Sequence, residues 1–216
     1  RVALAARLGD LPAVAETGFI GRSRDLLALQ RLLREEKYAV VRGQGGEGTT
    51  AFVAEFARWM VRSQRMRRSA FVSVETDGNQ RAVVEALGKQ LVRRDFSAAG
   101  DLEEAIRKVE RALREQPALL VIDSMESILL PPFMQKESPE ALSAEAREEL
   151  KAILALCERL LNAGDTRVVF TSREAVPAPF DAERHRRLDR RDLALDAGDE
   201  RLDLALDARV RAERVR

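Results

Sequence analysis

The residues best suited to chemistry form a glycine-rich segment between a short apolar run, 38–42, and a segment whose apolar residues have helical spacing. Its sequence is Gly43-Gln44-Gly45-Gly46-Glu47-Gly48-Thr49-Thr50. Because glycine has no Cβ atom, such a backbone can wrap closely around phosphate oxygens with its N–H groups turned inward. The helix that follows adds the positive end of its dipole. We therefore predict a phosphate-binding loop whose ligand-binding residues are Gly43, Gly45, Gly46, Glu47, Gly48, Thr49 and Thr50.

The position that usually carries lysine in such a loop is Thr49. The pattern G-x-x-x-x-G-K-[S/T] is met at Gly43, at Gly48 and at Thr50, whose hydroxyl is placed to hold Mg²⁺. A lysine would bring a full positive charge to the outer phosphates, whereas threonine brings a neutral hydroxyl. Since a hydrogen bond to a charged group contributes roughly 1.5–3 kcal/mol, we expect triphosphate binding to be weakened by about one to two orders of magnitude. Stabilisation of a transition state should suffer at least as much.

Two other interpretations of this segment stay open. The lysine could have been deleted rather than replaced, but replacement keeps Phe52, Val53 and Phe56 in register for a buried helix face, so we favour it. A glycine-rich turn can also be a plain connector between a strand and a helix.

Two later residues favour the phosphate loop over the connector. Asp123 ends the apolar run 118–122, and Arg173 follows the apolar run 167–171. Open parallel sheets bind ligands at the carboxyl ends of their strands, where both residues would lie. A carboxylate there can hold Mg²⁺ through water, and an arginine can contact a terminal phosphate.

The elements that must position these residues alternate along the chain. We predict strands at 38–42, 70–74, 118–123 and 167–171, separated by helices that end near 37, start at 50, cover 80–92, start at 101, and run from about 139 to 162. This alternation predicts an α/β fold with a mainly parallel, doubly wound sheet. The continuous apolar run at 118–122 is typical of a strand covered on both faces.

The sequence resembles the STAND class of P-loop ATPases, which includes NB-ARC and NACHT-like domains, and most closely bacterial regulators with caspase-like or tetratricopeptide modules. The resemblance covers about 17–175. It rests on four segments: Gly18-Phe19-Ile20-Gly21-Arg22, the loop 43–50, Leu119-Leu120-Val121-Ile122-Asp123-Ser124-Met125-Glu126-Ser127, and Val168-Val169-Phe170-Thr171-Ser172-Arg173. The last three are similar to the Walker A, Walker B and sensor-arginine segments of that class.

The resemblance implies a P-loop NTPase three-layer sandwich that binds ATP or ADP with Mg²⁺. Bound nucleotide would control the packing of a helical domain, and thereby other protein domains or subunits of a signalling assembly. By position, Ile20 and Arg22 would flank the nucleotide, Thr50 and Asp123 would serve Mg²⁺, Arg173 would sense the γ-phosphate, and Glu126 would be a candidate for polarising water. The sensor strand would lie between the loop strand and the Asp123 strand.

Several departures from that class predict slow or absent hydrolysis. Besides Thr49, Ser124 stands where many relatives have a second acid, so the general base is undetermined. The helical and winged-helix parts that close the site in relatives are not recognisable beyond 180. A pseudo-NTPase scaffold that binds no nucleotide is therefore the main alternative.

A DNA-associated ATPase is a further alternative, but we do not expect nucleic acid as a partner. Its basis is two arginine groups: Arg58, Arg62, Arg65, Arg67 and Arg68, then Arg184, Arg186, Arg187, Arg190 and Arg191. Arginines at the end of a helix complement its dipole, and the second group alternates with aspartates. No helix-turn-helix pattern accompanies them.

Composition and charge bound the remaining possibilities. The chain has 37 Lys and Arg against 36 Asp and Glu, so no global field draws it to nucleic acid or a membrane surface. No apolar run approaches the roughly 20 residues of a membrane span, and the N-terminus lacks the pattern of a secretory signal, so we expect a cytoplasmic location. The single cysteine, Cys157, has the spacing of a core residue, and His185 has no neighbours for a zinc site.

We divide the chain into three parts. Residues 1–16 are an N-terminal extension, 17–180 form the nucleotide-binding domain, and 181–216 form a charged tail, either helical or disordered, or the start of a truncated module. The tail repeats the hexapeptide Asp-Leu-Ala-Leu-Asp-Ala at 192–197 and 203–208.

Overall fold

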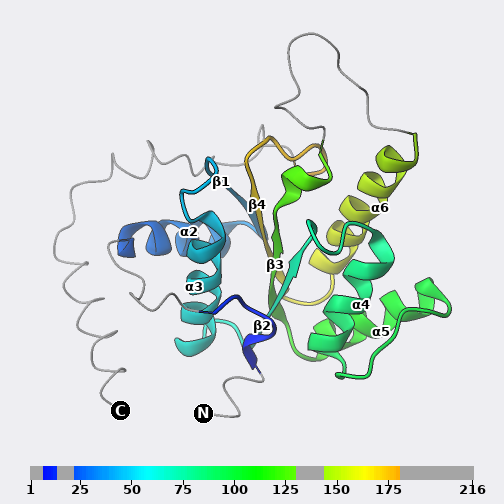
Figure 1. Ribbon diagram of the computed structural model, residues 1–216. Coiled ribbons are helices and arrows are strands. Elements are labelled where there is room, and N and C mark those ends of the chain that lie inside the picture. The colour runs from blue at the N-terminus through cyan, green and yellow to red at the C-terminus, as the bar shows by residue number, and fades with distance from the viewer. Residues whose placement is uncertain (1–6, 14–21, 130–143, 181–216) are drawn as a thin grey trace, which may run out of the picture.

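The computed structural model describes residues 7–13, 22–129 and 144–180 of the 216-residue chain (Figure 1). Ile20, the predicted helix start near 139 and the tail 181–216, with His185, lie outside these residues. Within the N-terminal extension, residues 7 and 8 are helical.

The centre of the molecule is a parallel sheet of four strands. These are β1 (Tyr38–Arg42), β2 (Arg68–Ser73), β3 (Ala118–Asp123) and β4 (Arg167–Ser172). Their order across the sheet is β1-β4-β3-β2, and every neighbouring pair is parallel. The strand that ends beside Arg173 therefore lies between the loop strand and the Asp123 strand, as expected.

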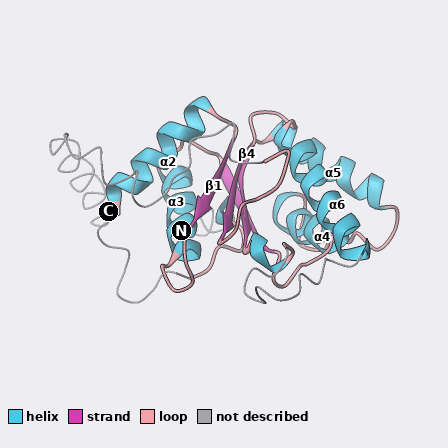
Figure 2. Ribbon diagram, turned by 90° about the horizontal axis from the view of Figure 1, so that it is seen from above, coloured by secondary structure: helices cyan, strands magenta, loops and turns pink. Residues whose placement is uncertain are grey.

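Helices cover both faces of this sheet (Figures 1 and 2). One face carries α2 (Ser23–Glu35) and α3 (Thr49–Arg62); the other carries α4 (Gln80–Leu91), α5 (Leu102–Glu115) and α6 (Ala144–Leu161). The predicted α/β fold, a three-layer sandwich with a parallel sheet, is confirmed. Among the described helices, none is long and apolar enough to cross a membrane.

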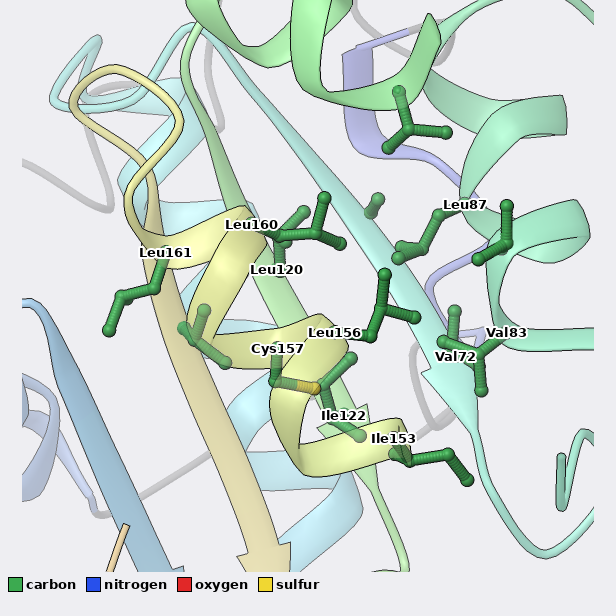
Figure 3. Close-up of a cluster of buried hydrophobic side chains, with 14 of the residues drawn as sticks. Val72, Val83, Leu87, Leu120, Ile122, Ile153, Leu156, Cys157, Leu160 and Leu161 are labelled. Carbon is green, nitrogen blue, oxygen red and sulfur yellow. The ribbon is translucent and has the colours of Figure 1, made fainter. Parts of the chain in front are cut away.

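The apolar pattern of β3 explains the two-sided core. All six of its residues are buried. Leu119 and Val121 pack with α2 and α3, whereas Leu120 and Ile122 pack with the other three helices, as the alternation of side chains along a strand requires. Figure 3 shows the second cluster, in which α6 directs apolar side chains at the sheet: Ile153, Leu156, Cys157, Leu160 and Leu161. Cys157 is buried in this core, and its burial raises the pKa of the thiol to about 12.

Several boundaries differ from those predicted by one or two residues, and three of them have reasons of register or capping. β2 begins at Arg68, not at 70, because Arg68 pairs with Ala118, the first residue of β3. β4 continues to Ser172, which pairs with Arg42 of β1. α3 begins at Thr49, one residue early, because Gly48 takes the N-cap position.

Arg68 closes the ends of two helices at the edge of the sheet. Its guanidinium donates to the carbonyl oxygens of Leu91 at 2.6 Å, Ala112 at 2.6 Å and Gln116 at 3.0 Å. The last carbonyls of a helix have no partner within the helix, so one side chain here satisfies acceptors of both α4 and α5. Burial lowers the pKa of Arg68, which Glu115 partly offsets.

We expect Arg68→Gln to lower the free energy of unfolding by about 1–3 kcal/mol, because glutamine cannot satisfy three carbonyls with charge-assisted bonds. Urea denaturation followed by circular dichroism measures the change. Arg111→Gln, at an exposed position of α5, is the matched control and should change stability by about 0.5 kcal/mol or less. Equal effects of the two substitutions would contradict the capping role of Arg68.

Candidate functional site

The glycine-rich segment forms the turn between β1 and α3, at the carboxyl end of the sheet. Gly46 and Gly48 have φ angles of 83° and 73°, in the left-handed region that residues with a Cβ rarely adopt. At Gly45 the reason for glycine is space, because a Cβ atom would lie 3.3 Å from the guanidinium carbon of Arg173. Glycine at these positions therefore allows the tight turn of the loop and the close approach of its backbone to Arg173.

The side chain of Thr49 folds back into this loop. A Cβ atom at Gly43 would overlap the Thr49 hydroxyl, so that hydroxyl lies against the start of the loop. Phe52, Val53 and Phe56 of α3 are buried, which is the register that replacement of the lysine predicts. The usual position of the lysine thus holds an uncharged side chain.

Asp123 is a buried carboxylate surrounded by hydroxyl groups from three elements. The Thr50 hydroxyl at the start of α3 lies 3.0 Å from Oδ1 and 3.1 Å from Oδ2. Thr171 of β4 donates to Oδ1 at 2.6 Å, and the Ser124 hydroxyl lies 3.2 Å from Oδ2. All of these donors are neutral, so they orient the carboxylate without neutralising its charge.

The backbone after β3 reinforces this arrangement. Ser124 has a φ of 62°, which is uncommon for a residue with a side chain and often accompanies functional sites. Its N–H donates to the Thr171 hydroxyl at 2.9 Å, the same hydroxyl that donates to Asp123. Both hydrogen-bonding roles of Thr171 are therefore used, and its hydroxyl ties the ends of β3 and β4 together.

Arg173 and Glu126 form an ion pair at the mouth of the loop. Arg173 Nε lies 3.1 Å from Glu126 Oε1, and the backbone N–H of Arg173 donates to Oε2 at 3.3 Å. Arg42, the last residue of β1, donates to the carbonyl oxygen of Arg173 at 3.3 Å. The three residues link the carboxyl ends of β1, β3 and β4.

Most of the predicted site residues line one cavity of about 260 Å³. Its described lining comprises Gly43, Gln44, Gly45, Gly46, Gly48, Thr49, Thr50, Ser124, Glu126, Thr171, Ser172 and Arg173. Asp123 lies beneath this lining, behind Thr50. Glu47 turns its carboxylate toward the loop backbone, where Oε2 accepts the N–H of Gln44 at 3.1 Å. The structure thus gathers the loop, the carboxylate and the arginine at one place.

Arg22 is not part of this lining. Its guanidinium lies 5.5 Å from the centroid of the Phe52 ring, and its Nε lies 3.8 Å from Asp25. Its predicted position beside a nucleotide stays a prediction, as does that of Ile20, which lies outside the described residues.

Four residues of the site have no predicted role from the sequence: Thr171, Ser124, Gln44 and Ser172. The role of Thr171 could have been predicted from the sequence, since it is the first polar residue after the apolar run of β4 and lies at the same sheet edge as Asp123. No sequence pattern predicts the roles of the Ser124 hydroxyl and the Gln44 backbone, because these depend on how the chain turns after each strand.

The donor set around Thr50 and Asp123 fits Mg²⁺. This ion takes oxygen ligands and is commonly held by one or two carboxylates or hydroxyls, with water and substrate phosphates completing its shell. Among the described residues, no group of three or more His, Cys, Asp or Glu side chains is placed to hold a metal ion without further ligands. The residues present suit an ion shared with a phosphate ligand.

The first arginine group lies toward the C-terminal end of α3, away from the glycine loop. Several of its members are engaged in contacts within the protein. Arg58 is buried and bonds to Glu55 at 3.3 Å, and Arg68 caps two helices. Arg65 lies over the ring of Trp59, 5.6 Å from its centroid. The second arginine group lies outside the described residues.

Comparison with known proteins identifies similar structures but no family. No protein-family model matches the chain, and no curated protein matches it. One similar solved structure is the Orc1 protein of Aeropyrum pernix in complex with DNA, at 19% identity and a TM-score of 0.46, covering 78% of this chain and 42% of that one. Another is PCH-2 of C. elegans, at 14% identity and a TM-score of 0.41, covering 76% and 40%. The chain spans less than half of each, and at these values the similarities carry no argument about function.

Proposed function

We propose that this chain is the nucleotide-binding domain of a signal-transducing P-loop NTPase of the STAND type, which binds ADP or ATP with Mg²⁺ and hydrolyses ATP slowly or not at all. The observation that carries the proposal is the contact of the Thr50 hydroxyl with both oxygens of Asp123, at 3.0 and 3.1 Å, directly behind a glycine loop. A plain connector between a strand and a helix would not require a buried carboxylate at this position.

The loop supplies what a diphosphate or triphosphate needs from a protein backbone. The loop and the first residues of α3 line the cavity, and a helix N-terminus favours negative charge. Arg173, whose guanidinium lies beside Gly45, is the cationic side chain among the described residues of the lining. Anion binding is therefore supported by dipoles and by one guanidinium rather than by a lysine.

Magnesium, when bound with a nucleotide, would neutralise phosphate charge and polarise the phosphoryl group. Thr50 would hold it through the hydroxyl oxygen, while Asp123 would act through water. The hydrogen bonds from Thr171 and Ser124 fix the Asp123 carboxylate, so its orientation is set before a ligand arrives.

Slow hydrolysis follows from two features of the site. Thr49 provides no charge to stabilise the phosphoryl group as bonds break. Glu126, the candidate for polarising water, has one oxygen near the side chain of Arg173 and the other near its backbone N–H. A carboxylate engaged in this way is a poor general base until the pair separates.

The signalling role rests on the resemblance to the STAND class. In such a switch the bound nucleotide controls how neighbouring protein domains pack, so the partners of this domain would be other parts of a signalling assembly. Slow hydrolysis suits a domain of this kind, because occupancy by ADP or ATP, rather than turnover, carries the signal.

A scaffold that binds no nucleotide is the second candidate, and one observation favours it. Among the described residues, no buried side-chain nitrogen or oxygen lacks a hydrogen-bond partner. The buried side chains of the site therefore find their hydrogen-bond partners within the protein. Titration with nucleotide separates the two candidates.

We expect MgADP to bind the unmodified chain with micromolar affinity, because the loop amides and Arg173 remain. Isothermal titration calorimetry measures this directly, and at about 100 times the dissociation constant the ligand should add roughly 2.7 kcal/mol to stability. No heat and no stabilisation, with the fold intact by circular dichroism, would leave the scaffold.

We expect Thr49→Lys to strengthen MgATP binding roughly 10- to 100-fold, because the new ammonium group would reach the outer phosphates. The same titration measures it, with phosphate release followed in parallel. Asn162→Lys adds the same charge at an exposed position at the end of α6, far from the loop, and should leave affinity unchanged. An equal gain in both variants would show a general charge effect.

We expect Thr50→Val to remove the dependence of nucleotide affinity on Mg²⁺, because valine keeps the shape of threonine but has no oxygen for the ion. Titrations of ADP with Mg²⁺ and with EDTA measure this dependence. Thr76→Val, in an exposed turn after β2, is the control and should retain it. Persistence of the magnesium dependence in Thr50→Val would argue against the assigned ion site.

A further inference from the structure

We infer that Glu126 is an internal competitor for phosphate: its carboxylate holds Arg173, and a phosphate ligand must take over this guanidinium to bind. The inference rests on the proposed function, since it concerns how the same site sets its affinity. It assigns Glu126 a role in ligand affinity that is distinct from polarising water.

The contacts of the pair are two-sided. Glu126 Oε1 lies 3.1 Å from Arg173 Nε, and Oε2 accepts the backbone N–H of Arg173 at 3.3 Å. Both carboxylate oxygens are therefore used on one residue. Glu126 is the more buried partner, with 19% of its side chain exposed against 47% for Arg173.

Arg173 is held over the phosphate loop by this pair. The guanidinium carbon lies 3.3 Å from the place of a Cβ atom at Gly45, and both terminal nitrogens lie 3.5 Å from it. Any larger residue at 45 would therefore press on the guanidinium. Because Thr49 is uncharged, the cation that a phosphate would meet in the described lining is the one that Glu126 already neutralises.

The fold fixes the position of Glu126. It lies in a single turn of 3-10 helix, Met125–Ser127, that follows the left-handed residue Ser124. Met125 is fully buried, so it anchors this turn in the core. Arg173 is fixed from its own side by β4 and by the hydrogen bond from Arg42. The pair is thus placed by two anchored backbones, in contrast to two long side chains that meet on a surface.

A phosphate that enters the loop must replace the Glu126 carboxylate at Arg173. A partly exposed ion pair accounts for roughly a two- to fivefold change in an equilibrium constant. Removal of Glu126, with Arg173 kept, should tighten phosphate binding by about that factor.

The test is a double-mutant cycle in the full chain, with MgADP and inorganic pyrophosphate as probes in calorimetry. We expect Glu126→Gln to tighten both roughly two- to fivefold, and Arg173→Gln to weaken both. The double variant should bind like Arg173→Gln, because Glu126 acts through that arginine. Glu148→Gln, which removes an exposed partner of Lys151 on α6, is the control and should change nothing.

Glu126→Asp separates release of the arginine from loss of charge. It keeps the negative charge but shortens the side chain, so it can no longer reach both donors, and we expect it to tighten binding as well. A gain in Glu126→Gln that persists without Arg173, or no gain in Glu126→Asp, would reduce Glu126 to simple repulsion and overturn the inference. Equal binding by the unmodified chain and Glu126→Gln would also overturn it while leaving the proposed function intact. No binding by any variant would overturn both the inference and the proposed function. If the unmodified chain shows no binding but Glu126→Gln binds the probes, the inference is supported.

Discussion

The buried carboxylate of Asp123 is the constraint on which the rest of the site depends. A charged group in the interior is costly unless hydrogen bonds and charge compensate it. Here the hydroxyls of Thr50, Thr171 and Ser124 converge on it from α3, β4 and the turn after β3. To bring those donors together, the chain must place β4 between β1 and β3, and α3 directly behind the loop. The sheet order and the geometry of the loop therefore satisfy one polar group at the carboxyl edge.

The core provides the rigidity that this arrangement requires. β3 and β4 are buried along nearly their whole length, with helices on both faces. Because close-packed interiors do not deform continuously, the ends of these strands cannot shift far relative to one another. The polar residues at the strand ends inherit this rigidity, so Thr171 meets Asp123 at 2.6 Å without help from a flexible loop. The turn Met125–Ser127 is fixed in the same way, through buried Met125.

Much of the fold was predictable from the sequence, because apolar periodicity is a local property. The apolar run at 118–123 predicted strand β3. The glycine loop, Asp123 and Arg173 were each recognisable from the sequence as parts of the site. The hydroxyl network was not predictable, since it depends on the side-to-side order of strands and on the left-handed turn at Ser124. The position of Arg22 against Phe52 could not be predicted either, because no pattern says which way a guanidinium turns at the start of a helix. The start of β2 was misplaced by two residues because Arg68 does not fit an apolar run, although it pairs with Ala118 at the start of β3.

The absence of the lysine changes the balance of charge at the loop more than its shape. The backbone keeps glycine at the left-handed positions Gly46 and Gly48, and α3 keeps its buried register. Among the described residues that line the cavity, Arg173 is the cation that remains to offset the carboxylates of Glu47 and Glu126. One of them accepts a loop N–H and the other holds Arg173, so each occupies a donor that a phosphate would use. In a loop with lysine, an additional positive charge would offset these carboxylates. If the site binds phosphate as we propose, its acidic side chains would compete with the ligand directly, and its affinity would depend on how firmly they are held.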